Sequence, residues 1–186
     1  MIGSREGGRF DFPKPTHAKP EDIVLDLFGG LELYRTAWDA IGGVAEPSDE
    51  EQGLKIGGKW GDLLPNIPEG ENYLWHTDRR GGEPLFGWRT RYWSFLLKLA
   101  KRPPSWTIQA QPALRSENNR RLTFEELWRL QTFPDDLKLD CARTEMQRML
   151  GNAVPSLIAE ILAREGPPAA VQFAAGRTAS PPSAPA

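Results

Sequence analysis

Prolines and glycines interrupt this sequence so often that they limit how long any helix or strand can run. The chain has 18 glycines and 17 prolines among its 186 residues, well above the roughly 12% that the two residues usually contribute together. Proline cannot continue a helix, and glycine favours turns. Hydrophobic residues make up 39% of the chain, which is enough for a core. The sequence predicts one domain, or one domain plus an appendage, with many turns and loops around its core.

The cysteine content and the apolar runs exclude several classes of protein. The single cysteine, Cys141, excludes a disulfide framework and any metal site built from several thiolates, and it fits a reducing compartment. No apolar run approaches the roughly 18 residues of a membrane span, and residues 1–20 lack the apolar stretch of a signal peptide. His17 and His76 have no second ligand at metal spacing. We therefore expect a cytoplasmic protein with no metal site and no membrane partner.

The charges are strongly segregated along the chain, although the net charge is only −2. Residues 21–78 carry −10 and residues 79–121 carry +8. The cations of the basic segment are Arg79, Arg80, Arg89, Arg91, Lys98, Lys101, Arg102, Arg115, Arg120 and Arg121, interleaved with Phe86, Trp88, Tyr92, Trp93 and Trp106. Arginine forks suit phosphate groups and guanine edges. The segment is therefore a candidate nucleic-acid surface, and a solvated basic face that balances the acidic segment is an equally open reading.

Capping residues and apolar patterns predict where helices begin and end. Thr123 and Glu126 form a capping box, and a helix should run from there to about Thr132. Leu122 and Leu127 occupy the two positions of a hydrophobic staple. Further helices are expected at 37–41 after the Thr-x-x-Asp entry of Thr36 and Asp39, at 90–100 with Thr90 as its cap, at 143–150 with Gly151 closing it, and from Pro155 to 165. A strand is expected at 105–111, a strand end at 1–4 and a long loop at 46–72.

Two motifs near the C-terminal end resemble a known family. Residues 121–136, RLTFEELWRLQTFPDD, and residues 151–155, GNAVP, resemble in order the last two conserved blocks of DNA (cytosine-5) methyltransferases. Residues 2–17 are similar to the stretch that follows the family's Gln-x-Arg-x-Arg block. Between these anchors the family places its variable target-recognition region, and Thr107-Ile108 resembles the Thr-(Leu/Ile/Val) pair near the end of that region. The resemblance covers roughly residues 1–165.

The resemblance implies a mechanism and a role for several residues. Enzymes of this family flip the target cytosine out of double-stranded DNA, attack it with a cysteine, protonate it through a glutamate and methylate it from S-adenosylmethionine. By resemblance, Asn152, Ala153 and Val154 complete the wall around the adenosyl group, and Thr107 lies near the DNA backbone at the flipped nucleotide. The helix after Thr123 braces the recognition region. The remaining DNA-binding candidates are Arg79, Arg80, Arg89, Arg91, Arg120 and Arg121.

The catalytic blocks of the family do not occur in this sequence. The family's nucleophile lies in a Pro-Cys-Gln tripeptide on the N-terminal side of the matched blocks, whereas Cys141 lies between the last two blocks. The Glu-Asn-Val and Gln-x-Arg-x-Arg blocks are also missing. Asp26-Leu-Phe-Gly-Gly30 resembles the family's cofactor loop, but Leu31 and Glu32 replace its later glycines. We therefore assign no catalytic residue and expect about half of such an enzyme.

Three functional hypotheses remain open at this point. The chain could be the DNA-recognition and cofactor-pocket portion of a cytosine-5 methyltransferase that is inactive alone, a DNA-binding specificity subunit that acts with a separate N-terminal catalytic chain, or a degenerate inactive fragment. An apolar face of the last helix, with Leu157, Ile158, Ile161 and Leu162, motivates the second hypothesis.

The resemblance implies an α+β fragment, part of a doubly wound S-adenosylmethionine-dependent methyltransferase domain with a small irregular target-recognition domain. We expect the end of the catalytic strand block and a turn at 1–22, the recognition region with long loops at 23–120, the conserved blocks and closing helix at 121–165, and a disordered Ala/Pro tail at 166–186.

Overall fold

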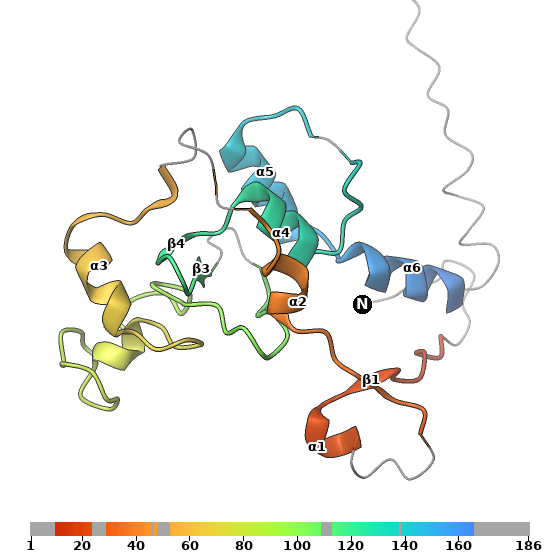
Figure 1. The fold of residues 1–186 in the computed structure, drawn as a ribbon, viewed down its shortest axis with the longest axis horizontal. Helices are drawn as coiled ribbons and strands as arrows, with labels where there is room; N and C mark the ends of the chain where they lie inside the picture. Colours follow the sequence, from red (N-terminus) through yellow and green to blue (C-terminus); the bar gives the residue numbers. More distant parts are fainter. Residues whose placement is uncertain are drawn as a thin grey trace, which may run out of the picture.

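The computed structural model describes residues 10–23, 29–45, 47, 53–108, 113–137 and 139–165, and it consists of short helices joined by long loops (Figure 1). The α-helices are α1 (Pro20–Ile23), α2 (Ala37–Ile41), α3 (Gly58–Leu63), α4 (Phe124–Leu130), α5 (Arg143–Asn152) and α6 (Ser156–Glu165), and the 3-10 helices are η2 (Leu64–Asn66) and η3 (Tyr73–His76). The predicted strand end at 1–4, most of the Asp26–Gly30 segment and the tail lie outside the described residues.

The strands form two small pairs. β1 (His17–Ala18) runs parallel to β2 (Glu32–Leu33), and β3 (Leu114–Arg115) runs antiparallel to β4 (Arg120–Arg121). Each of these strands is two residues long, in keeping with the frequent prolines and glycines. The described residues therefore have the mixed helix and strand content that the sequence predicts.

An apolar core joins α2, α4 and α5. Its buried members are Ala37, Ile41, Val44, Leu99, Leu122, Leu127, Trp128 and Leu150. α4 lies between α2 and α5, as Figure 1 shows. Burial of each large side chain of this kind stabilises the fold by roughly 1.5–3 kcal/mol, so this core holds the three helices together despite their short length.

A second group of buried side chains orders the loop-rich part of the chain that contains α3. Together with the half-buried rings of Trp60, Trp75, Phe86, Trp88 and Phe95 that pack on it, we call this group the aromatic cluster. Its buried members are Leu64, Ile67, Tyr73, Leu74, Leu96 and Leu114. Trp60 stacks on Phe86, and Phe86 packs edge-to-face on Tyr73, both with ring centroids 5.5 Å apart. Such aromatic pairs contribute about 0.5–1.5 kcal/mol beyond their buried area. Ring packing, more than regular backbone structure, therefore orders these loops.

Two of the predicted helix starts, those of α4 and α2, form with the caps expected from the local sequence. Thr123 and Glu126 make the capping box of α4, and Thr36 and Asp39 make an equivalent box at α2. α4 ends at Leu130, two residues before the predicted end. These boxes satisfy backbone N–H groups that a helix leaves without internal partners.

The helix predicted at residues 90–100 does not form. Leu96 has a φ of +54°, which a right-handed helix does not allow. The backbone N–H of Lys98 donates to the carbonyl of Glu71 at 2.9 Å, and that of Leu99 donates to the carbonyl of Leu114 at 2.8 Å. Pairing with distant segments therefore replaces the hydrogen bonds of a helix. The apolar pattern reflects burial in two different clusters, since Leu96 and Leu99 belong to separate ones.

Three other local predictions also require correction. Residues 46–72 do not form one loop, because α3 and η2 lie within them. Residues 105–108 of the predicted strand are irregular, and the rest of it lies outside the described residues. α5 runs through Gly151 to Asn152 instead of ending at the glycine. In each case the backbone continues or breaks according to its tertiary contacts, which the local pattern does not contain.

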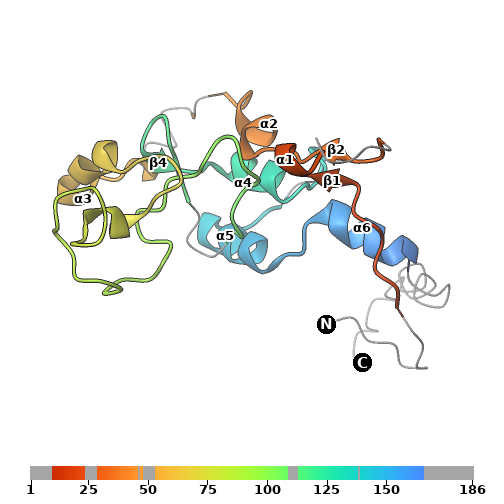
Figure 2. The ribbon, with the colours of Figure 1, turned by 90° about the horizontal axis from the view of Figure 1, so that it is seen from below.

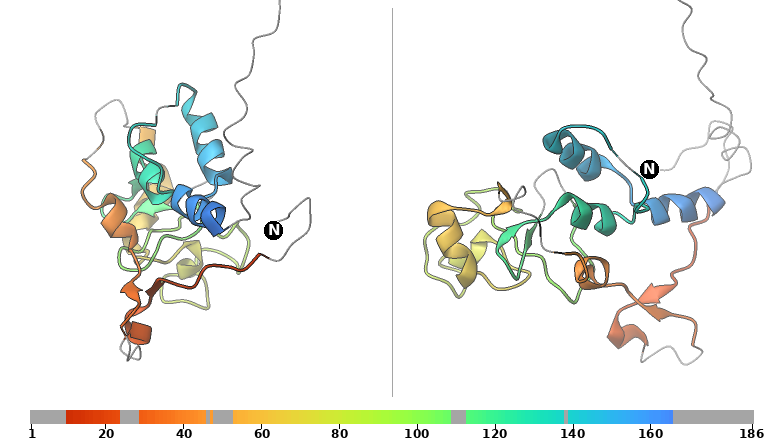
Figure 3. Two further views of the ribbon diagram at one scale, coloured as in Figure 1. Left: turned by 90° about the vertical axis from the view of Figure 1, so that its right-hand side faces the viewer. Right: turned by 45° about the horizontal axis from the view of Figure 1, so that its top comes forward.

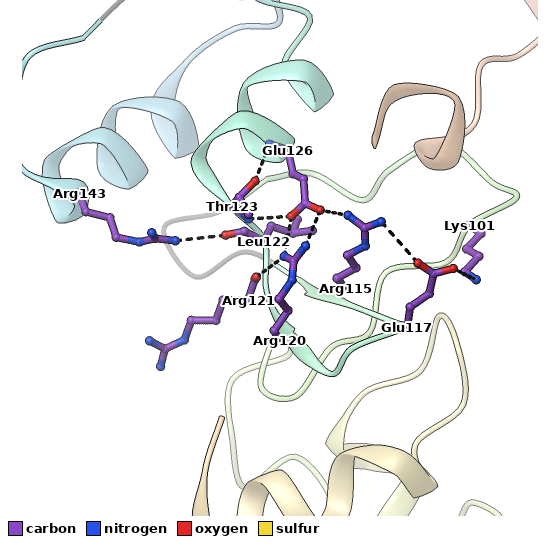
Figure 4. A network of polar contacts seen from close by, with 9 residues as sticks. All are labelled: Lys101, Arg115, Glu117, Arg120, Arg121, Leu122, Thr123, Glu126 and Arg143. Atoms are coloured by element: carbon purple, nitrogen blue, oxygen red, sulfur yellow. Dashed lines mark hydrogen bonds and ion pairs between the residues drawn. The ribbon is translucent and has the colours of Figure 1, made fainter. Parts of the chain in front are cut away.

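A buried ion network links the β3–β4 hairpin to the start of α4 (Figure 4). The carboxylate of Glu126 is 0% exposed and accepts hydrogen bonds from Arg115 and Arg120, the latter at 2.8 and 3.0 Å. It also accepts the backbone N–H of Thr123 at 2.7 Å. Arg115 reaches Glu117 as well, and Glu117 pairs with Lys101 at 2.8 Å. We call these residues the Glu126 network.

The helices of the structure are short. Within the part of the chain that the structure describes, none combines the length and the apolar composition that crossing a bilayer requires.

Neutralising Glu126 should destabilise the fold strongly. Glu126→Gln removes the buried charge that Arg120 and Arg115 share, although Arg115 keeps Glu117, and breaking a buried ion pair in this way costs about 3–5 kcal/mol. Glu125→Gln is the matched control, because that side chain is exposed and pairs with Arg129 across one helical turn; we expect a loss of at most about 0.5 kcal/mol there. Chemical denaturation measures both, and equal losses would contradict the role of the network.

Acid should weaken the fold through the same carboxyl. Burial alone raises the pKa of Glu126, but hydrogen bonds from Arg120, the Thr123 backbone and Arg115 outweigh burial and hold this pKa below its ordinary value. A lowered pKa in the folded state gives stability that is present above the unfolded-state pKa, near about 4.3, and is lost as the pH falls through the folded-state pKa. Denaturation midpoints should therefore fall below about pH 4.3, and the fall should be smaller in Glu126→Gln than in Glu125→Gln.

Candidate functional site

The loop that follows η3 carries two of the basic candidates and is fixed at both of its ends. The carbonyl of His76 accepts the backbone N–H groups of Leu85 and Phe86 at 3.0 and 2.9 Å. Inside the loop, the backbone N–H of Gly82 donates to the carbonyl of Trp75 at 3.0 Å. The loop between 77 and 84 therefore projects Arg79 and Arg80 from a closed base; we call it the arginine loop.

The buried side chain of His76 contacts the backbone of the arginine loop. It is 3% exposed, and its Nδ1 lies 3.1 Å from the carbonyl oxygen of Glu83. Because a carbonyl only accepts hydrogen bonds, Nδ1 carries the proton. His17, the other histidine, contacts the Thr16 hydroxyl and Glu32. Both histidines thus make polar contacts within the fold. Among the described residues, no group of metal-ligating side chains occurs.

Three exposed arginines lie against aromatic rings, two of them at Trp88. The guanidinium of Arg79 lies 4.6 Å from the centroid of Trp88, and that of Arg89 lies 6.0 Å from it. Arg91 lies 5.8 Å from the ring of Phe95, and Arg80 pairs with Glu71 at 3.0 Å. A cation held over an aromatic face keeps its hydrogen-bond donors free for an anionic ligand. The structure therefore brings Arg79, Arg89 and Arg91 to the aromatic cluster as positioned cations.

Thr107 lies in a different part of the surface. It is exposed, and it follows Trp106, which packs edge-to-face on Trp93 with ring centroids 5.1 Å apart. A cavity of about 10 Å³ lies beside these residues and is lined also by Ser94 and Leu122. That volume holds about one water molecule. Thr107 is therefore open to solvent and is not enclosed in a ligand pocket.

The two arginines of β4 point in opposite directions. Arg120 is 2% exposed and belongs to the Glu126 network, whereas Arg121 is exposed and points away from that network in Figure 4. Successive residues of a strand face opposite sides, which explains the difference. The Arg120 side chain thus pairs with Glu126 in the interior, while Arg121 is accessible to a ligand.

The GNAVP motif forms the bend between α5 and α6. Asn152 is exposed at the end of α5, and Ala153 is extended. Val154 is 58% exposed. The side chain of Gln131 donates to the carbonyl of Leu150 at 2.7 Å and so fixes the end of α5.

Two residues that the sequence did not single out position the other side of this bend. The backbone N–H of Ser156 donates to the Gln131 carbonyl at 3.1 Å, and the hydroxyl of Thr132 accepts the backbone N–H of Leu157 at 3.1 Å. Gln131 and Thr132 lie within the motif at 121–136, so their place in a shared block was the available signal. The end of α4 therefore holds the start of α6.

The site candidates lie toward two ends of the molecule. α3 and the aromatic cluster are at one end, and α6 is at the other, in the views of Figures 1 and 2 and in the right panel of Figure 3. The arginine loop belongs to the first end, whereas Val154 adjoins α6. The structure thus separates the arginine loop from the predicted cofactor-binding residues, whereas Arg120 and Arg121 lie on β4, between the two ends.

A family model agrees with the two motifs at the end of this chain. The model of the C-5 cytosine-specific DNA methylase matches residues 24–166. The chain belongs to this family. Its C-5 methylase domain is therefore of the S-adenosylmethionine-dependent methyltransferase fold, and enzymes of the family use that cofactor. The match includes both the arginine loop and the bend between α5 and α6.

Several curated relatives resemble the chain over part of their length. The type II methyltransferase M.SacI of Streptomyces achromogenes is 36% identical over 180 residues, which is 88% of this chain and 45% of the relative. M.NgoFVII of Neisseria gonorrhoeae is 33% identical over 83% of this chain and 41% of the relative, and M1.HphI of Haemophilus parahaemolyticus is 27% identical over 88% and 41%. The chain spans less than half the length of these relatives. No solved structure matches it.

A side chain at Gly82 should disturb the arginine loop. A Cβ there would lie 2.6 Å from Cδ1 of Trp75 and 2.9 Å from Nδ1 of His76. We expect Gly82→Ala to destabilise the fold by about 1–3 kcal/mol, as overpacking does. Gly43→Ala is the control, since a Cβ at Gly43 meets nothing within 4 Å. Denaturation of the two variants compares them, and an unchanged stability of Gly82→Ala would contradict the close packing of the loop.

Proposed function

We propose that this chain supplies the DNA-recognition and cofactor-pocket portion of a DNA cytosine-5 methyltransferase, which transfers a methyl group from S-adenosylmethionine to cytosine in double-stranded DNA. The observation that carries the proposal is the family match across residues 24–166 together with the exposed arginines around Trp88 inside it. In this proposal residues 23–120 are the target-recognition region, and residues 121–165 close the catalytic domain.

DNA binding in this proposal depends on charge and on the form of the arginine loop. Arg79, Arg89 and Arg91 are exposed and held against aromatic rings, so their guanidinium groups are positioned before DNA arrives. Such forks contact phosphate oxygens or the acceptor edge of guanine. Arg80, Thr107 and Arg121 are exposed and complete the proposed contacts. Arg120 supports this surface from the interior through Glu126.

The residues of the bend between α5 and α6 fit the wall of an adenosyl pocket. Asn152 is exposed and offers both donors and an acceptor, and Val154 is exposed and apolar. The nucleoside of S-adenosylmethionine has both polar edges and flat apolar faces, so a polar and an apolar side chain at one bend suit it. Bound S-adenosylmethionine supplies the methyl group. The part of this chain is to hold the nucleoside and exclude water beside it.

The nucleophile of the reaction is not assigned to this chain. Cys141 is half-buried in the turn before α5, where neither motif of the family is matched. We propose that the half of a family enzyme that this chain does not match carries the catalytic cysteine and glutamate.

A second candidate function is that of a specificity subunit that docks on a separate catalytic chain. The observation that favours it is the exposed apolar face of α6, where Leu157, Ile158 and Ile161 are each about half exposed, at 45%, 50% and 46%. Contiguous apolar surface of this kind marks an interaction site more often than a solvated face.

DNA binding should depend on salt through the arginines of the loop. Between about 50 and about 200 mM salt, log K should fall linearly with log salt, by about one unit of slope for each phosphate contact. The double variant Arg79→Gln with Arg89→Gln should lower the slope by about two. The control is Arg148→Gln with Arg164→Gln, which removes two exposed cations from α5 and α6. A chain with no affinity for DNA would instead support the degenerate fragment.

Methyl transfer should require the other half of an enzyme of this family. The purified chain alone should incorporate no methyl groups into DNA, and incorporation should appear when a chain spanning the missing half is co-expressed. Ile158→Asp should reduce co-purification of the two chains, because it places a charge on the apolar face of α6. Ala159→Asp, on a neighbouring exposed position of the same helix, should not. Methylation by the chain alone would overturn the proposal.

A further inference from the structure

Two exposed tryptophans near Thr107 have no role in the proposed function. Trp93 and Trp106 are 46% and 49% exposed, and their rings pack edge-to-face at 5.1 Å with an interplanar angle of 72°. They are 13 positions apart in the sequence, so the fold brings them together. We call them the tryptophan pair. About half of each indole is therefore in contact with solvent, which leaves room for a further flat group to pack on it.

Hydrogen bonds restrain the backbone at both tryptophans. The buried side chain of Asn72 donates to the carbonyl of Trp93 at 2.8 Å and accepts the backbone N–H of Leu74 at 3.0 Å. On the other side, the hydroxyl of Ser105 donates to the carbonyl of Trp106 at 2.9 Å. These bonds hold the backbone of each tryptophan, so its ring is presented to solvent at little further cost in conformational entropy.

The charge around the pair favours a polyanion. Of the four cations in residues 91–108, Lys98 is buried and donates to the carbonyl of Leu64, and Lys101 pairs with Glu117. Arg91 and Arg102 are exposed. A ligand that combines negative charge with flat apolar faces matches this surface, and nucleic acid has both, because its bases stack on aromatic side chains while its phosphates meet the cations.

The geometry of a DNA duplex decides whether a paired or an unpaired base can stack on the tryptophan pair. Paired bases inside a duplex cover one another's faces, so an indole ring stacks only on a base that has left the stack or at a step that has opened. Resting on the proposed function, we infer that the tryptophan pair is a stacking site for an unpaired nucleobase of the bound DNA. The exposed Thr107, next to Trp106, lies at the same place on the surface.

The test compares two duplexes that differ only in one unpaired pyrimidine. Fluorescence anisotropy of the full chain should show tighter binding of the duplex with the single-nucleotide bulge. Trp93→Ala and Trp106→Ala should each weaken binding of the bulged duplex on the order of tenfold, which is the expected loss for one base–aromatic stack. Trp93→Phe and Trp106→Phe should keep most of the preference, because phenylalanine also stacks. Phe12→Ala is the control for loss of an exposed ring, since Phe12 is 73% exposed outside the basic segment.

The outcomes separate this inference from the proposed function. If the chain binds the matched duplex with the expected salt dependence, and the alanine variants keep the preference for the bulge, the stacking site is wrong and the proposed function stands. If the alanine variants lose affinity for both duplexes equally while their thermal unfolding is unchanged, the pair contacts duplex DNA in general and the inference is again wrong. If the chain binds neither duplex, both proposals fail.

Discussion

The burial of one carboxylate between two arginines is the constraint on which the rest of this structure depends. Glu126 ties the first turn of α4 to both strands of the β3–β4 hairpin. A backbone bridge between Lys55 and Arg120 then joins the hairpin to the segment before α3. Because a buried carboxylate without its cations is costly, the start of α4 and the hairpin stabilise one another. Short elements are sufficient here because a shared charge network holds them.

The sequence predicted those parts of the structure whose causes are local. A capping box needs only residues three apart, so the starts of α2 and α4 were predictable from Thr36 and Thr123. The failed helix at 90–100 shows the limit. Leu96 and Leu99 of its apolar pattern are buried, whereas Tyr92 and Trp93 are exposed. Leu114, whose backbone pairs with Leu97 and Leu99, is distant in sequence. Where burial is divided between two clusters, an apolar pattern cannot tell a helix from a folded loop.

The sequence indicated which residue types form the candidate site, but not the contacts that hold them in place. The run of cations between 79 and 121 indicated a basic surface, and the structure gathers its first members around Trp88. Which of two adjacent arginines faces the interior depends on the register of β4, and no local signal gives it. The support of the arginine loop by His76 and the closure of the bend by Gln131 are long-range hydrogen bonds. Such bonds are properties of the assembled chain.

The separation of the arginine loop from α6 has an evolutionary consequence. The arginine loop is closed by hydrogen bonds to Trp75 and His76. The residues that hold the bend between α5 and α6 belong to the end of α4. A change of side chain on the outside of the loop therefore touches none of the contacts that shape the bend. Substitutions on the arginine loop can therefore change its ligand preference while the structure of the bend between α5 and α6 stays the same.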